Sequence, residues 1–291
     1  MQTRSLGPGA SEVPVVGFGG MPLSITGRPG ETTGISVIHA ALDSGMTLID
    51  TADVYCFDDG DIGHNERLIA KALRSWPGDR NRVIVATKGG LTRPSGSWEQ
   101  SARPDRLKLA CERSLAALAV ERIDLYQLHA PDPSVPFADS VGALADLQRE
   151  GKIRWVGLSN ASVEEILEAG EILPVVSVQN RLNPFFREAI AEGVVAHCGR
   201  NGIGFLAYSP LGGGQLNQKL PGHPVPSGIA KKRGLSAHAV VLAWVLAQGP
   251  SVIVIPGART PEHARDSATA AALALDPEEL DAIDRAEFSR A

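Results

Sequence analysis

The chain alternates short apolar runs with longer segments in which apolar residues recur every three or four positions. The apolar runs have the length of buried strands, and the periodic segments have the spacing of amphipathic helices. The predicted strands are residues 15–18, 46–49, 82–88, 123–129, 153–159, 175–179, 204–208 and 252–255. The predicted helices are residues 32–44, 64–74, 103–118, 137–150, 163–171, 186–200 and 236–248, with a terminal helix that begins at a capping box, 276–279.

This alternation amounts to about eight strand–helix units with no change of composition between them. Strands that alternate with helices pair in parallel, and right-handed crossovers repeated eight times close into a barrel. An open doubly wound sheet usually carries a glycine fingerprint after its first strand, but the segment 17–20 (GFGG) lacks the third glycine and no helix begins there. We therefore predict an α/β fold, a (β/α)8 TIM barrel, with residues 1–291 in one domain.

Composition excludes several classes of protein. Hydrophobic residues make up 43% of the 291 positions and charged residues 21%, which is typical of a globular chain with a large core. The net charge of −5 and the absence of a long basic run argue against a nucleic-acid partner. The N-terminus has no apolar signal region, and the longest apolar run, 239–247, is too short to span a membrane.

The cysteines and histidines suggest neither a disulfide framework nor a metal site. Cys56, Cys111 and Cys198 are odd in number and widely spaced, which favours a reducing, cytoplasmic location. The seven histidines include no His-X-His pair and no HEXXH motif, so we expect no catalytic metal.

Polar side chains follow the carboxyl ends of most predicted strands, where barrel enzymes carry their catalytic groups. In chain order they are Asp50 with Tyr55, Lys88, His129, Ser159 with Asn160, Gln179 and Tyr208. Taken singly, each has an ordinary explanation: Asp50 as a turn or cap residue, Lys88 as a loop lysine, and His129 as a satisfied buried histidine. Asn160 would cap the next helix, and Gln179 would bond the backbone. Their occurrence at one end of successive strands favours a shared site, because the opposite end carries mostly turn residues.

These residue types suit a proton transfer to oxygen. A tyrosine is a poor acid at neutral pH unless something favours its anion. A neighbouring ammonium does so, and a carboxylate keeps that ammonium charged, so we expect Lys88 and Asp50 to lower the pKa of Tyr55. His129 could donate a hydrogen bond to a carbonyl oxygen that gains negative charge. Because no side chain delivers hydride, a reduced cofactor must supply it.

The sequence resembles the aldo-keto reductases along nearly its whole length. The matching motifs are DTADVY (50–55), ATKGG (86–90), DLYQLHAPD (124–132), GKIRWVGLSN (151–160), VQN (178–180), AYSPLGGG (207–214) and IPGARTPEH (255–263). The resemblance implies a general acid/base, Tyr55, that works with Asp50, Lys88 and His129. It implies nicotinamide contacts from Ser159, Asn160, Gln179 and Tyr208, and pyrophosphate contacts from Ser209, Pro210, Leu211 and Gly212.

Two departures from the family pattern affect the expected specificity. In familiar branches a lysine and an arginine after the last strand bind the 2′-phosphate of NADP, whereas Gly257 and His263 stand there in this chain. The nearest cation is Arg259, which could bind a phosphate bidentately or be an ordinary solvated loop residue. We expect Gly257 and Arg259 to contact the cofactor, with NADP favoured and NAD as the alternative. An acidic insertion, 57–62, is expected to border an open substrate pocket together with 21–30 and Trp98.

The resemblance implies an NADP(H)-dependent oxidoreductase that interconverts a small aldehyde or ketone and its alcohol, as a monomer or small homo-oligomer. One alternative is an NADP(H)-binding regulatory or sensor subunit with the same fold and little turnover. Another is a Schiff-base aldolase that uses Lys88, which would leave Tyr55 and Asp50 without a role.

Overall fold

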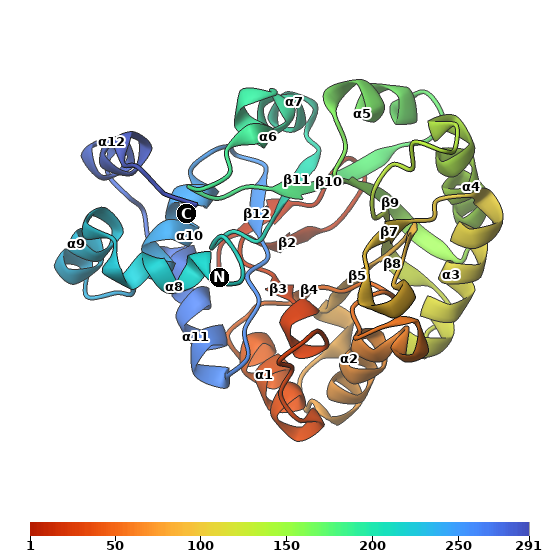
Figure 1. The fold of residues 1–291 in the computed structure, drawn as a ribbon, viewed down its shortest axis with the longest axis horizontal. Helices are drawn as coiled ribbons and strands as arrows, with labels where there is room; N and C mark the ends of the chain where they lie inside the picture. The colour runs from red at the N-terminus through yellow and green to blue at the C-terminus, as the bar shows by residue number, and fades with distance from the viewer. Residues whose placement is uncertain (291) are drawn as a thin grey trace.

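The computed structural model describes residues 1–290, and its centre is a curled sheet of eight parallel strands (Figure 1). In spatial order they are β3 (Phe18–Gly19), β4 (Leu48–Asp50), β5 (Ile84–Gly89), β8 (Ile123–Leu128), β9 (Ile153–Ser159), β10 (Val175–Arg181), β11 (Gly204–Tyr208) and β12 (Val252–Val254). The first and last strands meet, because the Gly17 N–H donates to the Val254 carbonyl at 2.8 Å and Gly19 pairs with Gly257. The predicted (β/α)8 barrel is confirmed.

Helices surround the sheet (Figure 1). They are α1 (Glu31–Asp43), α2 (His64–Ser75), α3 (Pro104–Leu118), α4 (Phe137–Arg149), α5 (Val163–Gly170), α6 (Glu188–Ala191), α7 (Val194–Asn201), α8 (Leu216–Lys219), α9 (Pro224–Arg233), α10 (Ala237–Leu246), α11 (Pro261–Thr269) and α12 (Pro277–Arg285). Short 3-10 helices are η1 (Met21–Leu23), η2 (Asp59–Asp61), η3 (Arg80–Arg82), η4 (Pro94–Gly96), η5 (Leu220–Gly222) and η6 (Ala270–Ala272). Among residues 1–290, no helix is long and apolar enough to cross a membrane.

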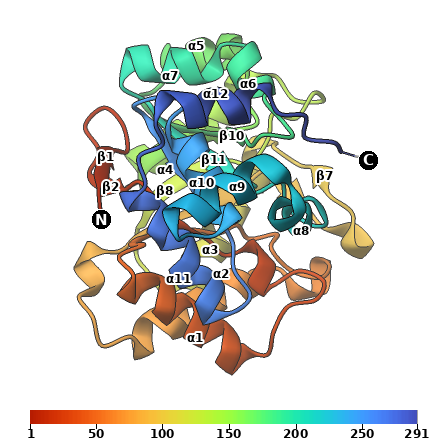
Figure 2. The same ribbon diagram turned by 90° about the vertical axis from the view of Figure 1, so that its left-hand side faces the viewer.

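Two hairpins lie outside the barrel. β1 (Thr3–Ser5) and β2 (Glu12–Pro14) form one, and β6 (Leu91–Thr92) and β7 (Glu99–Gln100) form the other. Figure 2 shows the first hairpin on one side of the barrel and β7, with the C-terminus, on the opposite side. The Gly204 N–H donates to the Leu6 carbonyl at 3.1 Å, so the first hairpin is fastened to the amino end of β11.

The helices differ from the sequence prediction in two ways. The single helix expected over 186–200 is wrong: α6 and α7 are separate, because Gly193 between them has a left-handed φ of 78°. The helices α8, α9 and α11 were not predicted, although Thr260 and Pro261 form an ordinary start for α11. The predicted caps at Ser236 and Asp276 are confirmed, since each side chain accepts a backbone N–H three residues on.

Apolar side chains fill two layers. One layer lies between the sheet and the helices, and the other fills the barrel interior and is closed by the β1–β2 hairpin through Leu6 and Val13. Helix α10 is buried on almost every side because α9 and α11 pack against it. The interior is therefore packed, and only the carboxyl rim of the strands is free to carry a site.

Candidate active site

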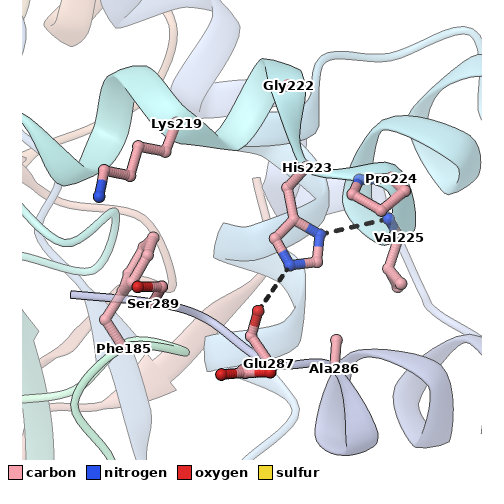
Figure 3. A pocket seen from close by; sticks show the side chains of 9 residues that line it. All are labelled: Phe185, Lys219, Gly222, His223, Pro224, Val225, Ala286, Glu287 and Ser289. Carbon is pink, nitrogen blue, oxygen red and sulfur yellow. Dashed lines mark hydrogen bonds between the residues drawn. The ribbon is translucent and has the colours of Figure 1, made fainter. Parts of the chain in front are cut away.

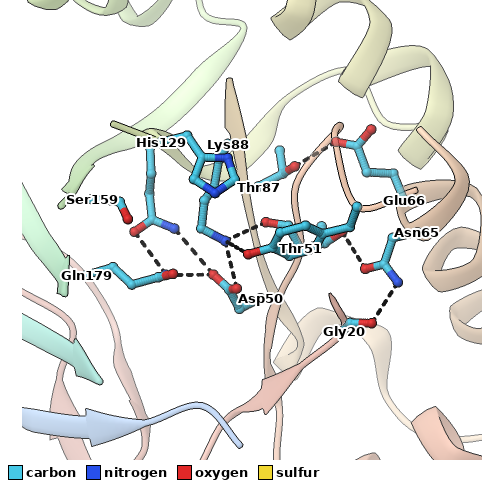
Figure 4. A network of polar contacts seen from close by, with 12 residues as sticks. Gly20, Asp50, Thr51, Asn65, Glu66, Thr87, Lys88, His129, Ser159 and Gln179 are labelled. Atoms are coloured by element: carbon cyan, nitrogen blue, oxygen red, sulfur yellow. Dashed lines mark hydrogen bonds and ion pairs between the residues drawn. The ribbon is translucent and has the colours of Figure 1, made fainter. Parts of the chain in front are cut away.

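Lys88 is the centre of a buried polar group on the carboxyl rim. Strands β4 and β5 are paired so that Asp50 lies beside Ala86. Lys88, two residues further on, therefore points to the same side of the sheet as Ala86. Its ammonium donates to Asp50 Oδ2 at 2.7 Å, to the Thr51 carbonyl at 2.8 Å and to Tyr55 Oη at 3.0 Å. Figure 4 shows Lys88 beside Asp50 and Thr51, and the Lys88 side chain has no exposed surface.

Two glutamines hold the other oxygen of Asp50. Gln179 Nε2 donates to Asp50 Oδ1 at 2.7 Å (Figure 4). Gln127 Nε2 donates to the same oxygen at 3.4 Å. Asp50 is thus neither a turn residue nor a helix cap, and Gln179 bonds a side chain rather than the backbone. Gln127 was not predicted, although it lies two residues before His129 and so on the same face of β8.

His129 and Tyr55 stand edge to face beside Trp98. The ring centroids of Tyr55 and His129 are 5.8 Å apart, and Trp98 lies 6.3 Å from Tyr55 and 6.4 Å from His129. His129 Nδ1 is buried and has no hydrogen-bond partner among residues 1–290, so this is not a satisfied structural histidine. Burial, and then the charge of Lys88, hold the pKa of His129 well below its usual value, so the imidazole is neutral.

The expected lowering of the Tyr55 pKa is wrong for this structure. Burial raises the pKa of Tyr55 well above its usual value, and the charge of Asp50 acts in the same direction. The physical reason is that the Lys88 ammonium is balanced by Asp50, while the phenol itself is removed from water. Burial also lowers the pKa of Lys88, against the opposing effect of Asp50. Tyr55 therefore holds its proton firmly near neutral pH and can serve as a proton donor.

Ser159, Asn160 and Tyr208 form a second bonded group on the rim. Asn160 Nδ2 donates to the His129 carbonyl at 3.0 Å and to Ser159 Oγ at 3.2 Å. Asn160 Oδ1 accepts from Tyr208 Oη at 2.8 Å. Asn160 has a φ of 56°, a left-handed conformation that asparagine tolerates. Helix α5 is capped by Ser162, so Asn160 is not its cap.

The segment after β11 presents its backbone in an unusual conformation. Ser209 has a φ of 47°, and Gly212, Gly213 and Gly214 all have positive φ. Asn183 Nδ2 fixes the start of this segment by donating to the Ser209 carbonyl at 2.9 Å. The predicted residues Pro210 and Leu211 lie between these left-handed positions.

The rim offers hydroxyl, amide and backbone N–H groups, and residues 1–290 contain no cluster of His, Cys, Asp or Glu able to hold a metal ion. Such donors match the amide and phosphate oxygens of a dinucleotide. The residues present therefore fit a nicotinamide cofactor.

Arg259 and Gly257 connect the end of β12 to the 21–30 segment. Arg259 Nη2 donates to the Thr26 carbonyl at 2.9 Å and its Nε to the Pro22 carbonyl at 3.3 Å, so this arginine is not simply solvated. Gly257 packs so closely that a Cβ there would lie 2.5 Å from Pro22 Cγ. Both predicted residues therefore order this loop, and the Arg259 guanidinium remains exposed.

Aromatic rings with stacked arginines border the rim. Phe57 is 41% exposed and Trp98 47% exposed. The Arg28 guanidinium lies 3.8 Å from the centre of the Phe57 ring, and Arg93 lies 3.9 Å from that of Trp98. Arg93 also donates to the carbonyls of Cys56 and Phe57, at 3.2 Å and 3.1 Å. Neither arginine was predicted, because the stacking of Arg28 on Phe57 and the bonds of Arg93 to Cys56 and Phe57 join distant segments.

A groove of about 510 Å³ is lined by residues other than those described on the rim. Figure 3 shows its lining residues, which are Phe185, Lys219, Gly222, His223, Pro224, Val225, Ala286, Glu287 and Ser289. None of them belongs to the Lys88 group. The chemistry is therefore assigned to the rim by its side chains and not to this groove.

The sequence is similar to known proteins along nearly its whole length. The model of the Aldo/keto reductase family matches residues 15–287. A probable aldo-keto reductase 1 of Glycine max is 36% identical over 311 residues, covering 96% of this chain and 87% of that protein. An uncharacterized oxidoreductase of Schizosaccharomyces pombe is 34% identical, covering 92% of this chain and 85% of that protein.

Solved structures show the same likeness. The chain is similar to a thermostable aldo-keto reductase in complex with the inhibitor epalrestat, with a TM-score of 0.82, 29% identity, and coverage of 98% of this chain and 99% of that one. It is also similar to a glycerol dehydrogenase from Gluconobacter oxydans, with a TM-score of 0.81, 31% identity, and coverage of 97% and 93%.

Proposed function

Because the chain belongs to the aldo-keto reductase family of oxidoreductases, we propose that it interconverts a small aldehyde or ketone and the corresponding alcohol with NADP(H). The observation that carries this proposal is the single bonded group of Lys88, Asp50 and Tyr55 beside the neutral ring of His129. A cofactor-sensing role with little turnover has no observation of its own in its favour.

The side chains divide the proton chemistry between them. A bound nicotinamide supplies the hydride in reduction and accepts it in oxidation. Tyr55 donates its proton to the carbonyl oxygen, and the Lys88 ammonium, 3.0 Å away, stabilises the phenolate that remains. Asp50 keeps Lys88 charged and oriented, while His129 donates an N–H to the same oxygen and directs it toward Tyr55.

The second bonded group and the segment after β11 would hold the cofactor. Ser159 and Asn160 offer hydrogen bonds to the carboxamide, and Gln179 offers its carbonyl oxygen, since its amide nitrogen is bonded to Asp50. Tyr208 provides a ring for stacking. The backbone and hydroxyl donors of 209–212 suit the pyrophosphate, and Gly257 and Arg259 suit the ribose 2′-phosphate, which favours NADP over NAD.

The test follows NADPH oxidation with a panel of aldehydes and ketones, including glyceraldehyde because of the likeness to a glycerol dehydrogenase. Tyr55→Phe is expected to bind NADPH within about threefold of wild type and to lose about 10²–10⁴-fold in kcat, the usual contribution of a general acid. Tyr126→Phe is the matched control, since Tyr126 is also buried and its hydroxyl bonds the Leu107 carbonyl, away from the Lys88 group.

Equal turnover by wild type and Tyr55→Phe would remove Tyr55 from the mechanism. Tight NADPH binding by wild type without turnover of any substrate would instead favour the sensor alternative.

A further inference from the structure

Two buried carboxylates next to the Lys88 group have no part in the proposed chemistry. Glu66 on α2 has no exposed surface, and Asp53, in the loop between Asp50 and Tyr55, is only 4% exposed. Glu66 Oε1 accepts from Thr87 Oγ1 at 2.6 Å (Figure 4). The other oxygen of Glu66, Oε2, and the Oδ1 of Asp53 have no hydrogen-bond partner among residues 1–290.

Neither carboxylate is neutralised by an adjacent cation. The three N–H groups of Lys88 are already directed at Asp50, Thr51 and Tyr55. No ion pair joins Asp53 or Glu66 to any lysine or arginine in the described chain. The ionisable groups that interact with the two carboxylates at longer range are Lys88 on β5, Tyr126 on β8, Cys111 and Arg113 on α3, Arg67 on α2, and Tyr55 and Cys56.

Two ionised carboxylates are costly in one apolar region without direct counterions, and two neighbouring acids commonly keep one proton between them. Burial raises the pKa of Asp53 well above its usual value, and the charge of Glu66 raises it further. Burial also raises the pKa of Glu66, while the hydroxyl groups of Thr87 and Ser114 oppose that effect. The positive charge of Lys88 lowers the pKa of both acids, so it favours a state in which one of them is ionised over a state in which both are protonated.

We propose that Asp53 and Glu66 share a single proton near neutral pH, and that their remaining negative charge sets the pH range in which Tyr55 exchanges its proton. Both are positioning residues that act on Tyr55 and Lys88 through the electrostatic field. The effect on catalysis rests on the proposed function, whereas the shared proton does not.

Gly63 lies next to both acids. Its N–H donates to the Asp53 carbonyl at 2.7 Å, and a Cβ on Gly63 would lie 3.6 Å from Glu66 Oε2. A groove of about 480 Å³ lies between η2, α2 and α3, and its wall includes Glu66 together with Gly63, Arg67 and Arg113.

The pH profile of kcat for alcohol oxidation tests the charge with Asp53→Asn, Glu66→Gln and the double variant. In either single variant the remaining acid keeps the negative charge, so the profile is expected to move by less than about 0.3 pH unit. The double variant removes that charge and so favours the Tyr55 phenolate. Its pH profile is expected to shift by about one pH unit toward lower pH, which corresponds to about a tenfold change in kcat where kcat rises with pH. Asp59→Asn, an exposed acid on the same groove, is the control.

If the shifts of the two single variants add up to that of the double variant, both acids are charged in wild type. If no variant shifts the profile, the two acids have a structural role alone. Either result overturns the proposal. Carboxyl ¹³C NMR supplies a readout independent of activity: one protonated carboxyl near neutral pH is expected in wild type and none in either single variant. Should wild type reduce no carbonyl compound, the proposed function fails while the NMR result still decides whether the proton is shared.

Discussion

Replacing Lys88 with methionine removes a fully buried ammonium and keeps a side chain of similar length. Three hydrogen bonds disappear, and Asp50 is left as a buried charge without its cation. Breaking a buried ion pair in this way costs about 3–5 kcal/mol of unfolding free energy. Because Gln127 and Gln179 still donate to Asp50 Oδ1, we expect a value near the lower limit, about 3 kcal/mol.

Urea unfolding at neutral pH measures this cost. The double variant Asp50→Asn/Lys88→Met removes both charges and is expected to recover about 1–2 kcal/mol relative to Lys88→Met alone. Lys71→Met is the matched control, because Lys71 pairs with Glu31 on the surface, with side chains 50% and 59% exposed. That surface pair should contribute less than about 1 kcal/mol.

A decrease in unfolding free energy of less than about 1 kcal/mol for Lys88→Met would contradict the reasoning, since a buried Asp50 that loses its paired cation should destabilise the fold by more. A double variant less stable than Lys88→Met would contradict it too. Both variants are expected to lack activity. The double variant should therefore regain stability without regaining activity, which separates the effect on stability from the effect on catalysis.

Three further outcomes follow from the contacts described above. Arg259→Ala should weaken NADPH binding about 10- to 100-fold and leave NADH binding unchanged by calorimetry; an equal loss for both cofactors would contradict the phosphate contact. Gly204→Ala would place a Cβ 2.3 Å from the Leu6 carbonyl oxygen and should cost about 1–3 kcal/mol of stability, while Gly199→Ala, with no contact closer than 3.8 Å, should cost nothing. Because the pKa of His129 is held low, the unfolded chain binds a proton at His129 below about pH 6.5, whereas the native ring stays neutral. As the pH falls below that value, the free energy of unfolding of wild type should decrease by about 1.4 kcal/mol per pH unit relative to His129→Gln. Parallel pH–stability curves for the two proteins would disprove this last expectation.

The strand positions and the rim residues could be read from the sequence because they depend on local pattern. Buried parallel strands appear as short apolar runs, and a polar residue that ends such a run must lie on the rim. Asp50, Lys88 and His129 were found in this way, whereas the segment after β11 was expected only from the family resemblance. The two helices that replace 186–200 were missed because one glycine, Gly193, overrides an otherwise helical pattern.

Only the tertiary structure decided which rim residues touch, since each contact joins positions far apart in the chain. Gln179 bonds Asp50 across 129 residues, and nothing near either position indicates it. Burial is likewise a property of the closed barrel, and it reversed the expected direction of the Tyr55 pKa. It also turned Asp53 and Glu66 from ordinary loop and helix acids into a buried pair. Residue type and spacing were set by the sequence; dielectric environment and long-range pairing arose only when the barrel closed.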